Sequence, residues 1–161
     1  MSPVPGTSIA PDPVIVTASP RKAAVVRFET PIAELRDEIR SGLAEVARSI
    51  ALNSLFPTGS PFTHYLTWHG EMVVAEVGFP VSGQLVPAGR VVGGELPGGT
   101  IASAFHVGPY ETIGEAYQRI EAWIRARGKE PGSTMWEAYL RGPGQETDPA
   151  RFRTEIFWPF H

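Results

Sequence analysis

The predicted element order strand, helix, strand, strand occurs twice along the 161 residues, and this repeat constrains the fold more than any other feature. After a shift of 78 residues, the apolar stripes of the two predicted helices superimpose. The matched pairs are Ile32 with Tyr110, Leu35 with Ile113, Ile39 with Tyr117, and Val46 with Ile124. Near the end of each half, a shift of 79 residues aligns segment 75–81 with 154–160 and matches both a Glu and a Pro. Because amphipathicity alone does not explain the shared Glu and Pro, we interpret the pattern as two βαββ units.

A βαββ unit of this size has one helix and can cover only one face of its sheet. Two units can pair their sheets about a pseudo-twofold axis. We therefore predict an α+β fold with one antiparallel sheet, both helices on one face, and a central ligand cleft on the other face. Interfaces between repeated halves are favoured places for ligand pockets.

Glycine and proline mark the boundaries of these units. The chain has 17 Gly and 16 Pro, and only Gly42 and Gly114 fall inside predicted helices. We expect a single domain at residues 13–160. A flexible leader at 1–12 precedes this domain. The domain itself consists of a first module at 13–81, a Gly/Pro-rich connection at 82–99, and a second module at 100–160.

Local patterns predict the individual elements. Two β-rich runs at 14–18 and 23–28 indicate a hairpin closed by residues 19–22. Thr30-Pro31 suits a helix start with Thr30 as N-cap, and the second helix begins either with a Thr112 capping box or with Pro109 at its first position. Further strands are predicted at 62–68, 71–79, 100–107, 135–140 and 153–158.

Composition excludes several classes of function. The chain has no Cys, which removes disulfide scaffolds and cysteine chemistry. The net charge is -3 and no basic run exceeds two residues, which disfavours direct nucleic-acid binding. With no signal peptide and no apolar stretch of membrane-span length, we expect a cytoplasmic protein. The four His lack metal-site spacing and no phosphate-binding motif is present, so we expect neither a metal nor a cofactor.

Glu137 is the unusual residue in an otherwise apolar and aromatic strand. Alternation places Met135, Glu137 and Tyr139 on one face of that strand and Trp136 on the other. A carboxylate facing a cavity is costly to ionise without a partner, so its pKa would rise, and a cationic ligand would relieve that cost. The alternative interpretation is a solvated strand residue.

Four short motifs occur in order along the chain: LPGG at 96–99, HVGPYE at 106–111, WEAY at 136–139 and TEIFWP at 154–159. Together they resemble the GyrI-like small-molecule-binding superfamily, which includes BmrR-type effector-binding domains, over about residues 13 to 160. The resemblance implies two tandem βαββ modules with a cleft between them, in which Glu137 is the buried acid that meets lipophilic cations. With this motif and the strand faces, the expected ligand-binding residues are Glu137, Tyr139, Trp136, Tyr110, Phe105, Tyr65, His64, Phe62 and Trp158. Unlike in the regulators, we expect no N-terminal helix-turn-helix, because the expected leader of about a dozen residues is too short to hold one.

Three functions are compatible with these residues. The first is binding of bulky aromatic small molecules, cationic ones included. The second, implied by stand-alone relatives, is hydrolysis of the strained cyclopropane ring of DNA-alkylating natural products, with Glu137 orienting water and Tyr110 assisting. The third is a protein-interaction module that modulates gyrase or a separate regulator.

Overall fold

The computed structural model describes residues 11–161, and these contain eight strands, two α-helices and three short 3-10 helices. The strands are β1 (Val14–Ala18), β2 (Arg21–Pro31), β3 (Phe62–His69), β4 (Met72–Pro80), β5 (Val91–Leu96), β6 (Gly99–Val107), β7 (Met135–Arg141) and β8 (Arg153–Pro159). The helices are η1 (Ile32–Glu34), α1 (Leu35–Leu52), η2 (Tyr110–Thr112), α2 (Ile113–Ala126) and η3 (Pro149–Arg151). The expected flexible leader at 1–12 lies outside the described residues, apart from residues 11 and 12.

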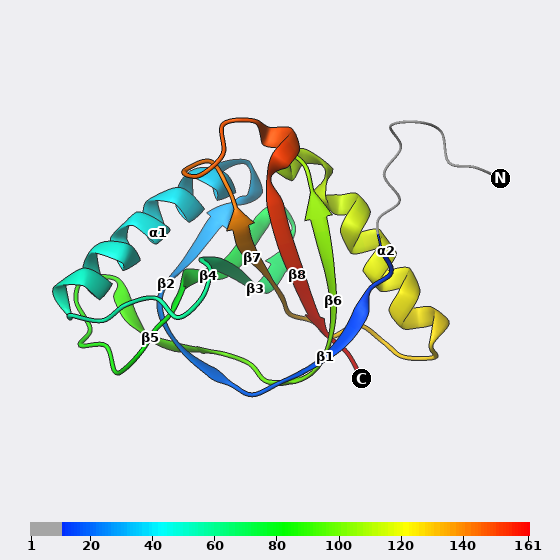
Figure 1. Ribbon diagram of the computed structural model, residues 1–161, viewed down its shortest axis with the longest axis horizontal. Coiled ribbons are helices and arrows are strands. Elements are labelled where there is room, and N and C mark those ends of the chain that lie inside the picture. Colours follow the sequence, from blue (N-terminus) through cyan, green and yellow to red (C-terminus); the bar gives the residue numbers. More distant parts are fainter. Residues whose placement is uncertain (1–10) are drawn as a thin grey trace.

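All eight strands form one antiparallel sheet in the order β1-β6-β8-β7-β3-β4-β2-β5. The order is symmetric about its middle, where β7 of the second module pairs with β3 of the first. The helices α1 and α2 lie on the two halves of this curled sheet (Figure 1). The predicted α+β fold with two βαββ modules is thus confirmed.

The sequence repeat matches equivalent elements. The shift of 78 residues carries η1 onto η2 and the start of α1 at Leu35 onto the start of α2 at Ile113. The shift of 79 residues carries Val77 of β4 onto Ile156 of β8, and both side chains are fully buried beneath the helices. The two halves therefore share their packing as well as their order of elements.

The outermost strands of the sheet are β1 and β5. β1 pairs with β6 of the second module, and β5, within the predicted connection, pairs with β2 of the first. The expected hairpin between residues 14–18 and 23–28 is therefore wrong. The physical reason is that β2 is an interior strand with β4 on one edge and β5 on the other, so it has no free edge for β1.

The first helix starts later than predicted, whereas the second starts directly after Thr112, one of its two predicted starts. Thr30 is not an N-cap; it is buried in β2, and one 3-10 turn separates that strand from α1. Thr112 does precede α2, but its hydroxyl donates to the carbonyl oxygen of Pro109 at 3.0 Å and does not cap the helix. In the first half, the 3-10 turn Ile32–Glu34 lies between the predicted cap and the α-helix, so α1 begins only at Leu35.

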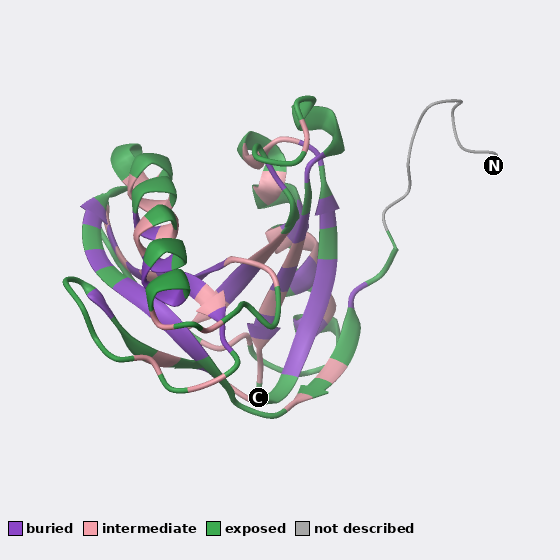
Figure 2. Cartoon of the chain, turned by 60° about the vertical axis from the view of Figure 1, so that its left-hand side comes forward, coloured by how far each residue is buried: buried purple, intermediate pink, exposed green. Residues whose placement is uncertain are grey.

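Both helices cover the same face of the sheet. Directly paired residues share a face, and one row across five strands runs Val77, Thr63, Glu137, Ile156 and Ala104. The first of these packs in the core under α1 and the last two pack under α2. Figure 2 shows buried stripes along the strands and exposed outer faces on the helices. We call this the helix-bearing face and its opposite the helix-free face.

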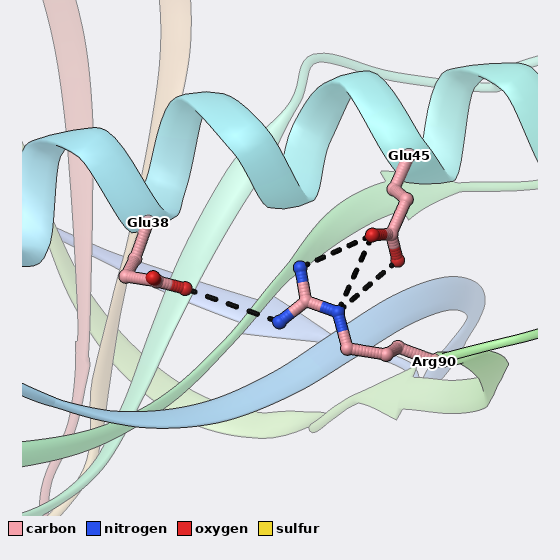
Figure 3. A network of polar contacts seen from close by, with 3 residues as sticks. All are labelled: Glu38, Glu45 and Arg90. Atoms are coloured by element: carbon pink, nitrogen blue, oxygen red, sulfur yellow. Dashed lines mark hydrogen bonds and ion pairs between the residues drawn. The ribbon is translucent and has the colours of Figure 1, made fainter.

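Close approach and surface ion pairs position α1. A Cβ added at Gly42 would lie 2.5 Å from Cγ2 of Val77, so the absence of a side chain lets the helix approach β4. Arg90, just before β5, lies 3.2 Å from Glu45 and 3.9 Å from Glu38 on the same helix (Figure 3). Such exposed pairs contribute little to stability. Among residues 11–161, no helix is long and apolar enough to span a membrane.

Candidate functional site

Glu137 lies in the middle of the helix-bearing face, on one of the two central strands. It is only 6% exposed, and its direct neighbours in the row are Thr63 on β3 and Ile156 on β8. Alternation along β7 directs this side chain toward the space between the two helices, as the register with the helix-covered residues requires. The expectation of a buried acid is therefore met, and the solvated alternative does not apply.

Three tyrosine hydroxyls donate hydrogen bonds to this carboxylate. Tyr117 of α2 lies 2.5 Å from Oε2, and Tyr65 of β3 and Tyr139 of β7 each lie 3.3 Å from Oε1. Tyr139 also shares a hydrogen bond of 2.6 Å with the Thr63 hydroxyl. We call Glu137, Tyr65, Tyr117, Tyr139 and Thr63 the acid–tyrosine cluster. It joins both central strands and the second helix around one buried charge.

The cluster is asymmetric although the fold repeats. Val77 and Ile156 are equivalent, and their paired neighbours are Thr63 and Glu137, so those two residues occupy equivalent positions. The shift of 74 residues that carries Thr63 onto Glu137 also carries Tyr65 onto Tyr139. The repeat therefore supplies one tyrosine from each half, but only the second half supplies an acid.

Burial dominates the electrostatics of the cluster. Burial raises the pKa of Glu137 above its ordinary value, while hydrogen bonds from Tyr117, Tyr139 and Tyr65 partly offset the rise by stabilising the carboxylate. Burial and then the nearby Glu137 charge raise the pKa values of these three tyrosines well above 10.0, so they remain protonated donors. Among residues 11–161, no Lys, Arg or His forms an ion pair with Glu137.

Tyr110 forms an outer layer of the cluster. Its ring packs edge-on against Tyr139, with the ring centroids 5.8 Å apart. The centroid of the Phe152 ring lies 5.3 Å from that of Tyr110. Burial raises the pKa of Tyr110, and the side chain is half-buried. Of the predicted ligand-binding residues, Glu137, Tyr139, Tyr65 and Tyr110 are thus brought together.

Three other predicted residues, Trp136, Phe62 and His64, lie on the helix-free face. Trp136 stacks on Phe157 at 5.3 Å and meets the His64 ring edge-on at 5.7 Å. A hollow of about 170 Å³ lies on this face, but the acid–tyrosine cluster does not line it. The structure does not bring these aromatic residues together with the acid, because successive residues of β7 point to opposite faces.

The last two predicted residues lie away from the carboxylate. Phe105 is on the helix-free face, where the Arg153 guanidinium lies 5.5 Å from its ring centroid. Trp158 is on the helix-bearing face, packs edge-on against Tyr117 at 5.8 Å and donates from Nε1 to the Gly132 carbonyl oxygen. Trp158 therefore supports a residue of the cluster without contacting the acid.

The sequence alone does not single out Tyr117 and Thr63 as site residues. Tyr117 falls on the apolar stripe of its helix, where it matches Ile39 in the repeat and is indistinguishable from a core residue. A tyrosine on a buried stripe has a hydroxyl that must find a partner, and this requirement was the available signal. Thr63 becomes a candidate only once β3 is known to pair with β7.

With the geometry in place, comparison with known proteins identifies the family. A family model of the GyrI-like small molecule binding domain matches residues 11–161. The chain belongs to the GyrI-like small-molecule-binding domain family. No curated protein shows significant sequence similarity to this GyrI-like chain.

Solved structures share the GyrI-like fold at low sequence identity. The EcmrR C-terminal domain is 20% identical with a TM-score of 0.81, over 93% of this chain and 97% of that domain. EcmrR in the cryo-EM structure of the EcmrR–DNA complex is likewise 20% identical, with a TM-score of 0.81 over 93% of this chain. This chain spans only 57% of the length of that EcmrR chain. A hydrolase encoded by lin2189 from Listeria innocua is 11% identical with a TM-score of 0.66, over 93% of this chain and 92% of that one. SAV2435 bound to tetraphenylphosphonium is 10% identical with a TM-score of 0.65, over 93% of this chain and 94% of the SAV2435 chain.

Proposed function

We propose that the protein binds bulky aromatic cations at the acid–tyrosine cluster. The observation that carries the proposal is the burial of Glu137 without an ion pair among the described residues. A buried carboxylate without a counter-ion is costly, and a lipophilic cation lowers that cost while burying its own apolar surface. The tyrosine rings around the carboxylate add cation–π attraction.

Two further facts support a cationic ligand. The tyrosine hydroxyls hold Glu137 in place, which reduces the cost of ordering the carboxylate when a ligand binds. SAV2435, which shares the fold, has been solved bound to tetraphenylphosphonium, a bulky aromatic cation. We take this cation as the probe for the present protein.

Calorimetric titration of tetraphenylphosphonium into wild type and Glu137→Gln tests the proposal. Removing the negative charge is expected to weaken binding by at least about tenfold. The matched control is Glu155→Gln, because Glu155 lies on the neighbouring strand β8 but on the helix-free face, where it accepts from Ser103 Oγ at 2.8 Å. This control should bind as wild type does. If Glu137→Gln binds the cation as tightly as wild type, the proposed charge recognition is wrong.

A second candidate function at the same site is hydrolysis of strained cyclopropane rings. It is favoured by the short hydrogen bond between Tyr117 and Glu137, which pairs a proton donor with a carboxylate whose burial raises its pKa toward the range useful for a general base. Glu137 would accept a proton from water as the water oxygen bonds to a ring carbon. The broken carbon–carbon bond leaves its electron pair on the acceptor part of the substrate, which then takes up a proton.

Mass spectrometry distinguishes this activity from binding alone. A cyclopropane-bearing alkylator incubated with the protein should gain the mass of one water, faster than in buffer and dependent on Glu137. Several such substrates showing no rate gain over buffer would contradict the hydrolase, while leaving cation binding to be judged by the titration.

A further inference from the structure

Arg36 connects the two modules at the outer edge of the acid–tyrosine cluster. It comes from the first turn of α1, in the first module. Its guanidinium carbon lies 4.8 Å from the ring centroid of Tyr110, and its Nη2 lies 3.7 Å from Oε1 of Glu111. Both partners belong to η2, in the second module. The cation therefore occupies a ring face that belongs to the other half of the molecule.

A continuous series of contacts leads from this cation to the buried acid. Arg36 lies over Tyr110, Tyr110 packs against Tyr139, and Tyr139 donates to Glu137. Tyr110 is thus the ring between the exposed guanidinium and the cluster. A ligand that reaches the cluster from this side meets the ring whose face Arg36 covers.

We propose that Arg36 is a built-in competitor for cationic ligands, which sets the selectivity of the Glu137 site by occupying the face of Tyr110. This inference rests on the proposed function, because it assumes that the site takes aromatic cations. A cationic ligand that stacks on Tyr110 must displace the guanidinium or bind close to a like charge. A neutral aromatic ligand meets no such charge repulsion.

The electrostatics of the cluster agree with a resident cation. Burial is the main influence on the pKa of Glu137 and raises it, and after the tyrosine hydrogen bonds the charge of Arg36 acts in the opposite direction. For Tyr110, burial again comes first and raises the pKa, and Arg36 lowers it. The positive charge therefore reaches both the outer ring and the acid.

The expected size of the effect follows from the exposure of Arg36. Its side chain is 49% exposed, and its ion-pair partner Glu111 is more exposed still. An exposed cation–π contact corresponds to about a two- to fivefold change in an equilibrium constant. Removing the guanidinium should therefore tighten cation binding by about two- to fivefold.

The test compares Arg36→Met with Arg40→Met. Methionine keeps much of the apolar stem and removes the charge. Arg40 lies one turn further along α1 and pairs with Asp37 of its own helix at 3.5 Å, so its replacement removes the same charge without uncovering Tyr110. Each variant is titrated at low ionic strength with tetraphenylphosphonium and with neutral triphenylphosphine oxide.

We expect Arg36→Met to bind the cation about two- to fivefold tighter than wild type, with Arg40→Met and the neutral probe unchanged. Equal or weaker cation binding by Arg36→Met would overturn the inference. The same gain for the neutral probe would also overturn it, because the effect would then be steric. An equal gain in Arg40→Met would overturn it as well, because the effect would then come from the net charge of the protein and not from the face of Tyr110. Failure of the proposed function has a different result, in which wild type and Glu137→Gln bind the cation equally, and both claims then fall.

Discussion

At the scale of single residues, the site depends on one carboxylate that the fold buries and only partly compensates. Three tyrosine hydroxyls stabilise the charged form of Glu137, but burial has the larger effect and its pKa stays raised. An acid whose pKa is raised by folding holds its proton more tightly in the folded state than in the unfolded state. The free energy of unfolding must therefore fall as pH rises through the interval between the two pKa values.

This linkage predicts a pH-dependent gain in stability for Glu137→Gln. Near pH 4 the acid is largely protonated in both states, so the variant differs from wild type only by an offset from its altered hydrogen bonds. Between the unfolded pKa, close to 4.5, and the higher folded pKa, wild type loses stability and the variant does not. The variant should gain about 1.4 kcal/mol relative to wild type for each unit by which folding raises the pKa.

Urea unfolding of both proteins at about pH 4 and about pH 7 measures this difference. Equal m-values would show that both proteins expose the same surface on unfolding, so that the stabilities can be compared. If the difference between variant and wild type is the same at both pH values, burial does not raise the pKa of Glu137 in the folded protein.

At the scale of elements, periodicity predicted the two helices and most strands, because each has one buried face. The starts of the helices and the partners of the strands were harder. Thr30-Pro31 matches a helix start, but here the buried strand β2 continues through both residues. The residues around Thr30-Pro31 do not by themselves predict the 3-10 turn that follows them.

Strand pairing shows the same limit. Residues 14–18 and 23–28 are adjacent in sequence and suit a hairpin, yet the first run pairs with β6 and the second has both edges occupied. Which edge a strand meets depends on the whole sheet, and neighbouring residues do not encode it. The Gly/Pro-rich connection likewise contains β5, in which Gly93 and Gly94 pair with Ala24 and Ala23 of β2.

At the scale of the whole molecule, the repeat accounts for both the symmetry of the fold and the asymmetry of the site. Two similar halves place Thr63 and Glu137 side by side at the centre of the sheet and supply one tyrosine each. The repeat in the sequence predicted the architecture. It also led us to expect the ligand cleft on the face opposite the helices, whereas the acid–tyrosine cluster lies on the helix-bearing face, because the register places Glu137 in one row with the helix-covered Val77 and Ile156. The pairing of β1 of the first module with β6 of the second further joins the halves into one sheet.

The proposed ligand site lies on the helix-bearing face, at the acid–tyrosine cluster. A crystal structure of the protein with tetraphenylphosphonium tests it most directly. We expect the phosphonium next to Glu137, with its phenyl rings against Tyr139 and the other tyrosines of the cluster. A cation bound instead in the helix-free hollow beside Trp136 and Phe62, with the Glu137 hydrogen bonds unchanged, would contradict it.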